Sequence, residues 1–148
     1  MIEKIRLKNL NISFEKVTGA DEQIEILYNH LKNRNCGISH KLLPQYQDHI
    51  TFVKNHPYRY WAMVLENNSY VGAVYLQTNN SIGINLLEPS KQLVSEVLRH
   101  IQENFKPAKE IRSTIPFYFY VNVAYANEKL SKVLLELDAI PLQVSYKV

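Results

Sequence analysis

The 148-residue sequence has little cysteine and little glycine, with one Cys and four Gly. The single cysteine, Cys36, excludes an internal disulfide and a metal site built from several cysteines. No run of about 18 apolar residues occurs, so we expect no membrane-spanning helix and no membrane partner. The N-terminal stretch alternates charged and apolar residues and lacks the apolar core of a signal peptide. We therefore expect a cytoplasmic protein.

Charge of one sign is not concentrated either. The formal net charge is +3, and the lysines and arginines are spread along the whole chain. A nucleic-acid surface usually needs a concentrated basic stripe, so we expect no nucleic-acid partner. Hydrophobic residues make up 46% and charged residues 21%, as in an ordinary globular domain. With no internal repeat and no long interior linker, residues 1–148 are predicted to form one domain.

The first half of the sequence predicts one strand and two helices. Residues 11–18 are β-rich and end at Gly19, which is typical of a strand and a turn. Asp21 is the expected N-cap of an amphipathic helix with apolar residues at i, i+3, i+4 and i+7. A second helix should open at Pro44 and stop before Pro57, because the residue before a proline disfavours the helical region.

The second half predicts a meander followed by alternating helices and strands. Three apolar, β-rich runs are separated by Asn67-Asn68 and Asn79-Asn80, which predicts three antiparallel strands joined by short turns. Pro89 is expected to start a long amphipathic helix. A β-rich run at 117–125, a fourth helix and a final strand at 141–148 complete the predicted order.

This order of elements, together with residues 38–76 and 120–148, resembles the GNAT superfamily of acyl-CoA-dependent N-acetyltransferases. The first stretch resembles the acceptor-side helix and hairpin of members that acetylate small amines or amino sugars. In the second stretch, Asn122 and Asn127 fall where the family often has asparagines that contact the acyl-CoA. The resemblance implies a GNAT-like α/β fold over 1–148, with a mixed, mostly antiparallel sheet and helices on both faces.

The resemblance also implies where acetyl-CoA would lie. In this family the fourth and fifth strands splay apart, and the gap admits the pantetheine arm of acyl-CoA. Backbone amides of the fourth strand, here residues 82–87 with Leu86 and Leu87 among them, would hydrogen-bond the arm and polarise the thioester carbonyl. We therefore predict that the strands at 82–87 and 117–123 lie side by side and diverge at Leu87. The amine attacks directly, so no protein nucleophile is needed.

The turn after this strand departs from the family pattern of Gln or Arg, two residues, Gly, one residue, and Gly or Ala. It has no glycine, Pro89 lacks an amide donor, and Glu88 adds a negative charge. Ser90, Lys91 and Gln92 are partial substitutes, because the first turn of a helix favours an anion. Two interpretations stay open: a weakened phosphate-binding turn, or a proline-initiated helix start with solvated polar residues.

A transferase also needs an acid for the leaving thiolate and a base for the amine. Tyr125 is the acid candidate, since acids in the family are often tyrosines near the fifth strand and the fourth helix. Glu88 is the candidate base, and Asn85 could orient a water. Ordinary packing for Tyr125 and a solvated surface for Glu88 remain the alternatives.

Acceptor contacts are predicted on the helix and strand that follow residue 38. Imidazole titrates near neutrality, which suits His40 and His49 for acceptor binding, although packing would also explain them. Because a strand alternates its side chains, one of two pairs should face the cleft: Arg59 with Trp61, or Tyr58 with Tyr60. The histidine spacing matches no metal-ligand pattern, so no metal site is predicted.

Two functions follow as hypotheses. In the first, the protein transfers an acyl group from acetyl-CoA to a small-molecule amine, with an amino sugar as one candidate. In the second, a GNAT-like module has lost acyl-CoA binding and serves as a binding or regulatory partner. A homodimer is compatible with both hypotheses.

Overall fold

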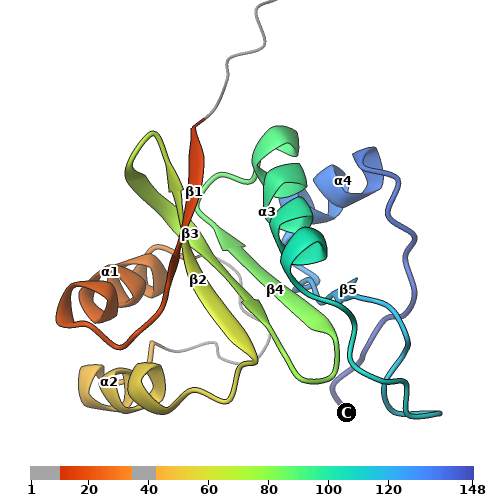
Figure 1. Ribbon diagram of the computed structural model, residues 1–148, viewed down its shortest axis with the longest axis horizontal. Coiled ribbons are helices and arrows are strands. Elements are labelled where there is room, and N and C mark those ends of the chain that lie inside the picture. Colours follow the sequence, from red (N-terminus) through yellow and green to blue (C-terminus); the bar gives the residue numbers. More distant parts are fainter. Residues whose placement is uncertain (1–10, 35–42) are drawn as a thin grey trace, which may run out of the picture.

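The computed structural model describes residues 11–34 and 43–148. Its sheet has five strands in the order β1-β2-β3-β4-β5, and Figure 1 shows this sheet between two pairs of helices. The first four strands pair antiparallel, and β5 pairs parallel with β4. The strands are β1 (Ile12–Lys16), β2 (Tyr60–Glu66), β3 (Ser69–Leu76), β4 (Ser81–Leu86) and β5 (Tyr120–Val121). The helices are α1 (Asp21–Lys32), α2 (Tyr46–Asn55), α3 (Lys91–Asn104) and α4 (Glu128–Glu136).

Each face of the sheet has its own apolar core. On one face, α1 and α2 bury Leu27 and Val53 against Met63 of β2. On the other face, α3 and α4 bury residues such as Val97 and Leu130 against the sheet. The mixed, mostly antiparallel sheet with helices on both faces confirms the predicted fold class. In the part of the chain that the structure describes, no helix is both long and apolar enough to cross a membrane.

The asparagine turns form as predicted, and one of them positions β5. Asn67 and Asn68 both have positive φ angles, 50° and 64°, as a tight hairpin turn requires. Asn80 also has a positive φ of 72°, and its side chain is fully buried. It accepts a hydrogen bond from the Ala108 amide (2.6 Å) and donates to the Pro116 carbonyl (2.8 Å). Asn80 therefore holds the segment that leads into β5 against the β3–β4 turn.

Three predicted helix starts are wrong by one or two residues. The second helix, expected to open at Pro44, begins at Tyr46, and Gln45 is its N-cap. Asp21 is the first residue of α1 and not its N-cap, which is Ala20. Pro89 precedes α3 without belonging to it, because Ser90 is the N-cap and its hydroxyl oxygen accepts from the Leu93 amide (3.1 Å). The capping hydroxyl fixes the first turn of α3 more directly than the proline does.

The predicted strands near the C-terminus are mostly absent. Of residues 117–125 only Tyr120 and Val121 form a strand, and 141–148 form none. Figure 1 shows the chain after α4 running past β5, and the whole of 139–148 is exposed. The period-two pattern of this segment is real, but a strand also needs a neighbouring strand as hydrogen-bond partner. In the part of the chain that the structure describes, no strand is hydrogen-bonded to this segment, although it passes β5.

Candidate functional site

The parallel pair β4–β5 is joined over only two residue pairs. These are Ser81 with Tyr120 and Ile82 with Val121, after which the pairing stops although β4 continues to Leu86. This confirms the predicted side-by-side arrangement and the loss of pairing toward Leu87. The open part of β4 is where the pantetheine arm is expected.

The direction of the β4 amides follows from its pairing with β3. The Ser81 carbonyl accepts from the Gln77 amide (2.9 Å), and the Leu87 amide donates to the Val71 carbonyl (3.0 Å). In an antiparallel ladder these hydrogen-bonding residues alternate, so odd-numbered residues of β4 face β3 and even-numbered residues face away from it.

Because of this alternation, the predicted donors Leu86 and Leu87 direct their amides to opposite edges of β4. The amides of Ile84 and Leu86 face the side of β5, beyond the last β4–β5 pair. The Leu87 amide is already used in its bond to β3. Leu86 is therefore placed as a donor toward the gap, with Ile84 as a second donor, and Leu87 is not.

The turn after β4 leads directly into the N-terminus of α3. The Ser90 hydroxyl accepts from the Leu93 amide, and the Ser90 carbonyl accepts from the Val94 amide (3.0 Å). No acidic residue lies in the first turn of α3, and Lys91 is exposed there. Between this turn and the end of α4 lies a groove of about 370 Å³, lined by Lys91, Gln92, Ser95, Glu96 and Leu137.

Glu88 does not point into a buried site. Its carboxylate lies 3.5 Å from the Lys129 ammonium of α4, and both side chains are exposed. Such an exposed pair is weak, and it offsets part of the negative charge that Glu88 brings to the turn. As a proton acceptor, Glu88 would work from the surface.

A polar cluster lies on the opposite side of β4, toward α1 and α2. We call it the Arg34 cluster; it consists of Arg34, Tyr58, Tyr75 and Asn85, all of which are half-buried. The Arg34 guanidinium donates to the Asn85 side-chain oxygen (Nη1 to Oδ1, 3.0 Å). The rings of Tyr58 and Tyr75 stack with centroids 4.2 Å apart and planes 9° apart.

Gly83 makes room for this cluster. A Cβ at Gly83 would lie 1.8 Å from Cζ of Tyr75, so the ring lies directly over the glycine. Neither Arg34 nor Tyr75 was predicted from the sequence. The local signal for Tyr75 was a glycine facing an aromatic residue on the neighbouring strand, and for Arg34 there was none.

Both stacked tyrosines stay protonated at neutral pH. Burial, and then the nearby Tyr75 ring, raise the pKa of Tyr58 to about 12, although the positive charge of Arg34 acts in the opposite direction. Burial also raises the pKa of Tyr75, again against the effect of Arg34. The cluster therefore offers a guanidinium and two phenol hydroxyls as hydrogen-bond donors.

The predicted acceptor residues are not brought together. His49 is buried, and its Nε2 lies 2.9 Å from the Ile24 carbonyl, so it joins α2 to α1. Burial lowers the pKa of His49. Trp61 is also buried and packs edge-on against Tyr58 (5.2 Å between centroids). His40 lies outside the described residues.

Arg59 lies away from Trp61. It donates to the Lys106 carbonyl (2.8 Å) and lies over the Phe105 ring, at the end of α3. Tyr60 bonds His100 on the same side of the sheet, whereas Tyr58 lies with Trp61. The predicted pairs, Arg59 with Trp61 or Tyr58 with Tyr60, are therefore wrong, because β2 and its alternation begin only at Tyr60.

The predicted residues around β5 and α4 have different surroundings. Asn127 caps α4, its side-chain oxygen accepting from the Leu130 amide (3.3 Å). Tyr125 lies in the turn before α4 and is 95% exposed. No hydrogen bond or ring contact joins Tyr125 to another residue of 11–34 and 43–148.

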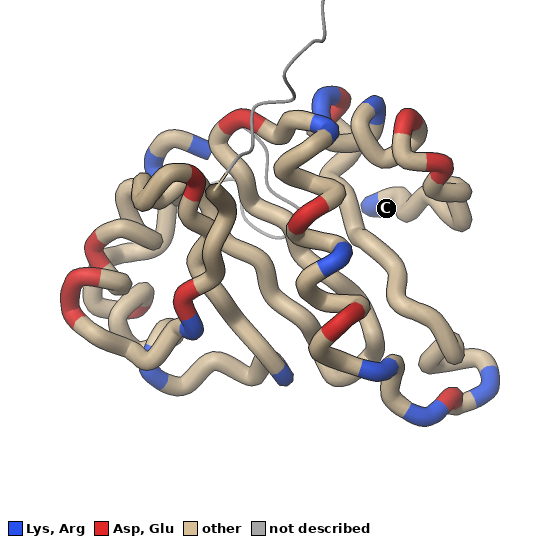
Figure 2. Tube along the Cα trace, turned by 45° about the horizontal axis from the view of Figure 1, so that its top comes forward, with Lys and Arg blue, Asp and Glu red and all other residues tan. Residues whose placement is uncertain are grey.

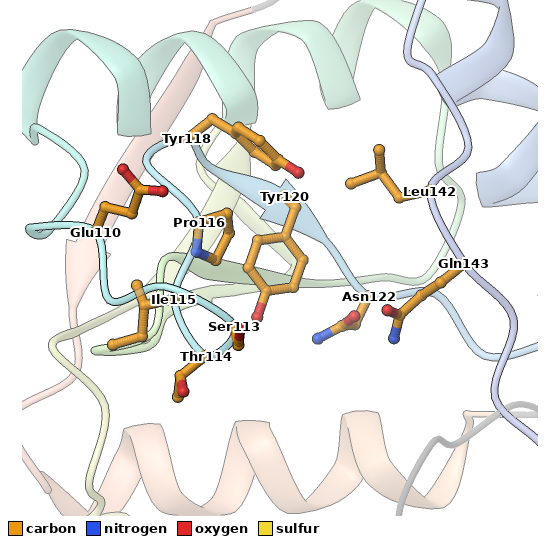
Figure 3. A pocket seen from close by; sticks show the side chains of 10 residues that line it. All are labelled: Glu110, Ser113, Thr114, Ile115, Pro116, Tyr118, Tyr120, Asn122, Leu142 and Gln143. Atoms are coloured by element: carbon orange, nitrogen blue, oxygen red, sulfur yellow. The ribbon is translucent and has the colours of Figure 1, made fainter.

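Asn122 lies in a pocket of about 420 Å³ beside β5, which Figure 3 shows from close by. Val121 and its odd-numbered neighbours pack against the core under α3 and α4, so Tyr120 and Asn122 face the side of α1 and α2. The pocket and the Arg34 cluster therefore lie on the same side of the sheet. The residues that line the pocket come from two stretches of the chain, 110–122 and 142–143: Glu110, Ser113, Thr114, Ile115, Pro116, Tyr118, Tyr120, Asn122, Leu142 and Gln143.

Comparisons with known proteins were made by sequence and by structure. No protein-family model and no curated protein matches the chain in sequence. A solved structure described as the crystal structure of a possible acetyltransferase from Clostridium difficile 630 superimposes with a TM-score of 0.54. The two chains are 9% identical, and the match covers 93% of this chain and 97% of the other. At this identity the likeness shows the fold, and it agrees with the predicted GNAT-like fold.

Proposed function

We propose that the protein is an acyl-CoA-dependent N-acyltransferase that transfers the acetyl group of acetyl-CoA to a small amine, with amino sugars as one candidate class. The observation that carries this proposal is the short β4–β5 pairing. Two strands of one sheet run parallel but are joined only at Ser81 and Ile82, and the Ile84 and Leu86 amides face the open side.

The residues along this gap partly fit acetyl-CoA, which would supply the acyl group as a thioester. The Leu86 and Ile84 amides would polarise the carbonyl by donating to its oxygen as negative charge develops there. The first turn of α3, with Lys91 and Gln92, would receive the phosphates at the positive end of the helix dipole. The missing glycines limit the number of amides that can reach a phosphate, so we propose a weak site.

The acceptor would enter on the side of α1 and α2. As the amine nitrogen bonds the carbonyl carbon and the carbon–sulfur bond breaks, the amine loses one proton and the thiolate gains one. We propose Tyr125 as the proton donor to the thiolate and Glu88, directly or through water, as the final proton acceptor. Asn85, fixed by Arg34, would orient the acceptor or a water at the open end of β4.

The turn between β4 and α3 favours the second candidate function, a binding or regulatory module without acyl-CoA. Besides lacking glycine, this turn loses the Leu93 amide to the Ser90 hydroxyl. The competing hypotheses therefore differ in one measurable property, which is whether acetyl-CoA binds.

Calorimetry with acetyl-CoA tests the proposal. We expect weak binding by the natural chain and a several-fold loss for Lys91→Ala, because one charged contact at an exposed helix end contributes about 1 kcal/mol. Lys132→Ala, which removes an exposed lysine of α4, is the matched control and should bind as the natural chain does.

A second variant separates a weak site from a closed one. Replacing residues 88–92 with a longer, glycine-containing turn adds amide donors at an existing helix N-terminus, so binding should become tighter. If neither the natural chain nor this variant gives any heat with acetyl-CoA, the transferase proposal is wrong and the module takes its place.

A further inference from the structure

Arg34 connects two parts of the chain that are far apart in sequence. It follows the end of α1, and its guanidinium reaches across to β4, where Nη1 lies 3.0 Å from Oδ1 of Asn85. Asn85 lies in the half of β4 that has no β5 partner. Arg34 is thus held next to the open end of β4, along which acetyl-CoA would lie during acyl transfer.

The positive charge of Arg34 has no described counter-ion. Over 11–34 and 43–148, the ion pairs join Arg99 to two glutamates and Lys129 to Glu88, and none involves Arg34. The rest of the sequence contains a single acidic residue, Glu3. A guanidinium has five N–H donors, and one neutral oxygen uses only one of them. A half-buried charge in this state is stabilised by an anion.

The neighbours of Arg34 also favour an anionic ligand. Tyr58 and Tyr75 are stacked and protonated at neutral pH, so both present O–H groups that can donate to an oxygen anion. No carboxylate belongs to the cluster. Its polar groups are thus matched to a ligand rich in acceptor oxygens.

We propose that Arg34 binds an anionic group, a carboxylate or a phosphate, carried by the amine acceptor. The planar fork of a guanidinium suits both groups, because each offers two oxygens for a bidentate contact. This inference rests on the proposed function, since it assigns the class of acceptor for the same site. The substrate is then an amine with a second, negatively charged end.

Matched acceptor pairs test the proposal by acetyl transfer. The pairs are β-alanine with propylamine, phosphoethanolamine with ethanolamine, and glucosamine 6-phosphate with glucosamine. We expect kcat/KM to be higher for the anionic member of at least one pair, and the pairs separate carboxylate from phosphate recognition. Arg34→Gln should lower kcat/KM for that anionic acceptor about ten- to a hundred-fold and leave the neutral acceptor nearly unchanged.

Two further variants separate charge recognition from a structural role. Arg34→Lys keeps the charge but not the fork, so it should retain part of the preference for the anionic acceptor. Arg112→Gln removes an exposed arginine outside the cluster and should change neither acceptor. If Arg34→Gln lowers kcat/KM equally for both members of a pair, Arg34 only supports the structure and the proposal is overturned.

Binding without turnover distinguishes this proposal from the transferase function. The same anionic compounds, without acetyl-CoA, should raise the melting temperature of the natural chain and not that of Arg34→Gln. If they do so while no acetyl transfer occurs with any amine, the anion site stands and the transferase function fails. If neutral amines are acetylated as well as anionic ones, the function stands and this inference fails. If the anionic compounds neither bind nor react, the inference fails as well.

Discussion

Tyr75 lies flat over Gly83, and this contact sets the position of the Tyr75 ring in the Arg34 cluster. A methyl group at Gly83 would overlap the ring, since its Cβ would be 1.8 Å from Cζ of Tyr75. We expect Gly83→Ala to lower the free energy of unfolding by about 1–3 kcal/mol, the usual cost of overpacking, in urea unfolding experiments.

A double-mutant cycle identifies the cause. In a Tyr75→Ala background the ring is absent, so adding Gly83→Ala should cost much less than it does in the natural chain. An equal cost in both backgrounds would show that the backbone at Gly83, and not its contact with Tyr75, resists the substitution.

Tyr125 is a residue whose proposed role rests on chemistry more than on packing. Its side chain is 95% exposed, so Tyr125→Phe should leave the free energy of unfolding unchanged. If it is the acid, kcat should fall strongly while the affinity for acetyl-CoA stays the same. Tyr146→Phe, another exposed tyrosine, is the control for loss of a surface hydroxyl. An unchanged kcat and pH profile for Tyr125→Phe would assign the proton to another group or to water.

At the scale of elements, His49 makes the packing of α1 against α2 sensitive to pH. Its buried Nε2 lies 2.9 Å from the Ile24 carbonyl, with the Tyr28 and Tyr46 rings beside it. Burial lowers the pKa of His49 below its ordinary 6.5. The neutral form therefore stabilises the fold above pH 6.5, and this contribution is lost as the pH falls through the lowered pKa.

We expect urea unfolding to show a loss of stability below pH 6.5, and His49→Gln to show a smaller one. Glutamine can still donate to the Ile24 carbonyl but does not titrate in this range. Part of this pH dependence of the free energy of unfolding should remain in His49→Gln, because burial also lowers the pKa of His30, His56 and His100. If the free energy of unfolding falls equally with pH in the natural chain and in His49→Gln, His49 does not cause the loss of stability.

The elements that the sequence predicted well are those with local signals. Helices with a 3.6-residue apolar period formed, and so did the asparagine turns, because each depends on residues a few positions apart. The strand expected at 141–148 failed because pairing depends on a distant partner. Arg34 was missed for the same reason, since its bond to Asn85 joins residues 51 positions apart.

Over the whole molecule, charges of both signs are interspersed. Figure 2 shows both Lys and Arg and Asp and Glu distributed along the described trace, on the helices of both faces. The unusual surface is apolar instead, and it lies after α4. Residues 140–148 place Leu142, Val144 and Tyr146 at every second position, and these side chains are 60%, 63% and 84% exposed. A segment with this pattern buries one face only when it pairs as a strand.

We expect this segment to pair with a second copy of the chain and form a homodimer. β5 ends the sheet, so its outer edge has no strand partner among the described residues, and it offers backbone groups for pairing. Light scattering after size exclusion should show a dimer whose fraction grows with protein concentration. Val144→Lys should shift the natural chain toward the monomer, because it places a charge on the apolar face. Ser145→Lys adds the same charge to the polar face and should leave the dimer in place. A natural chain that stays monomeric at every concentration, or equal effects of the two lysines, would contradict this mode of assembly.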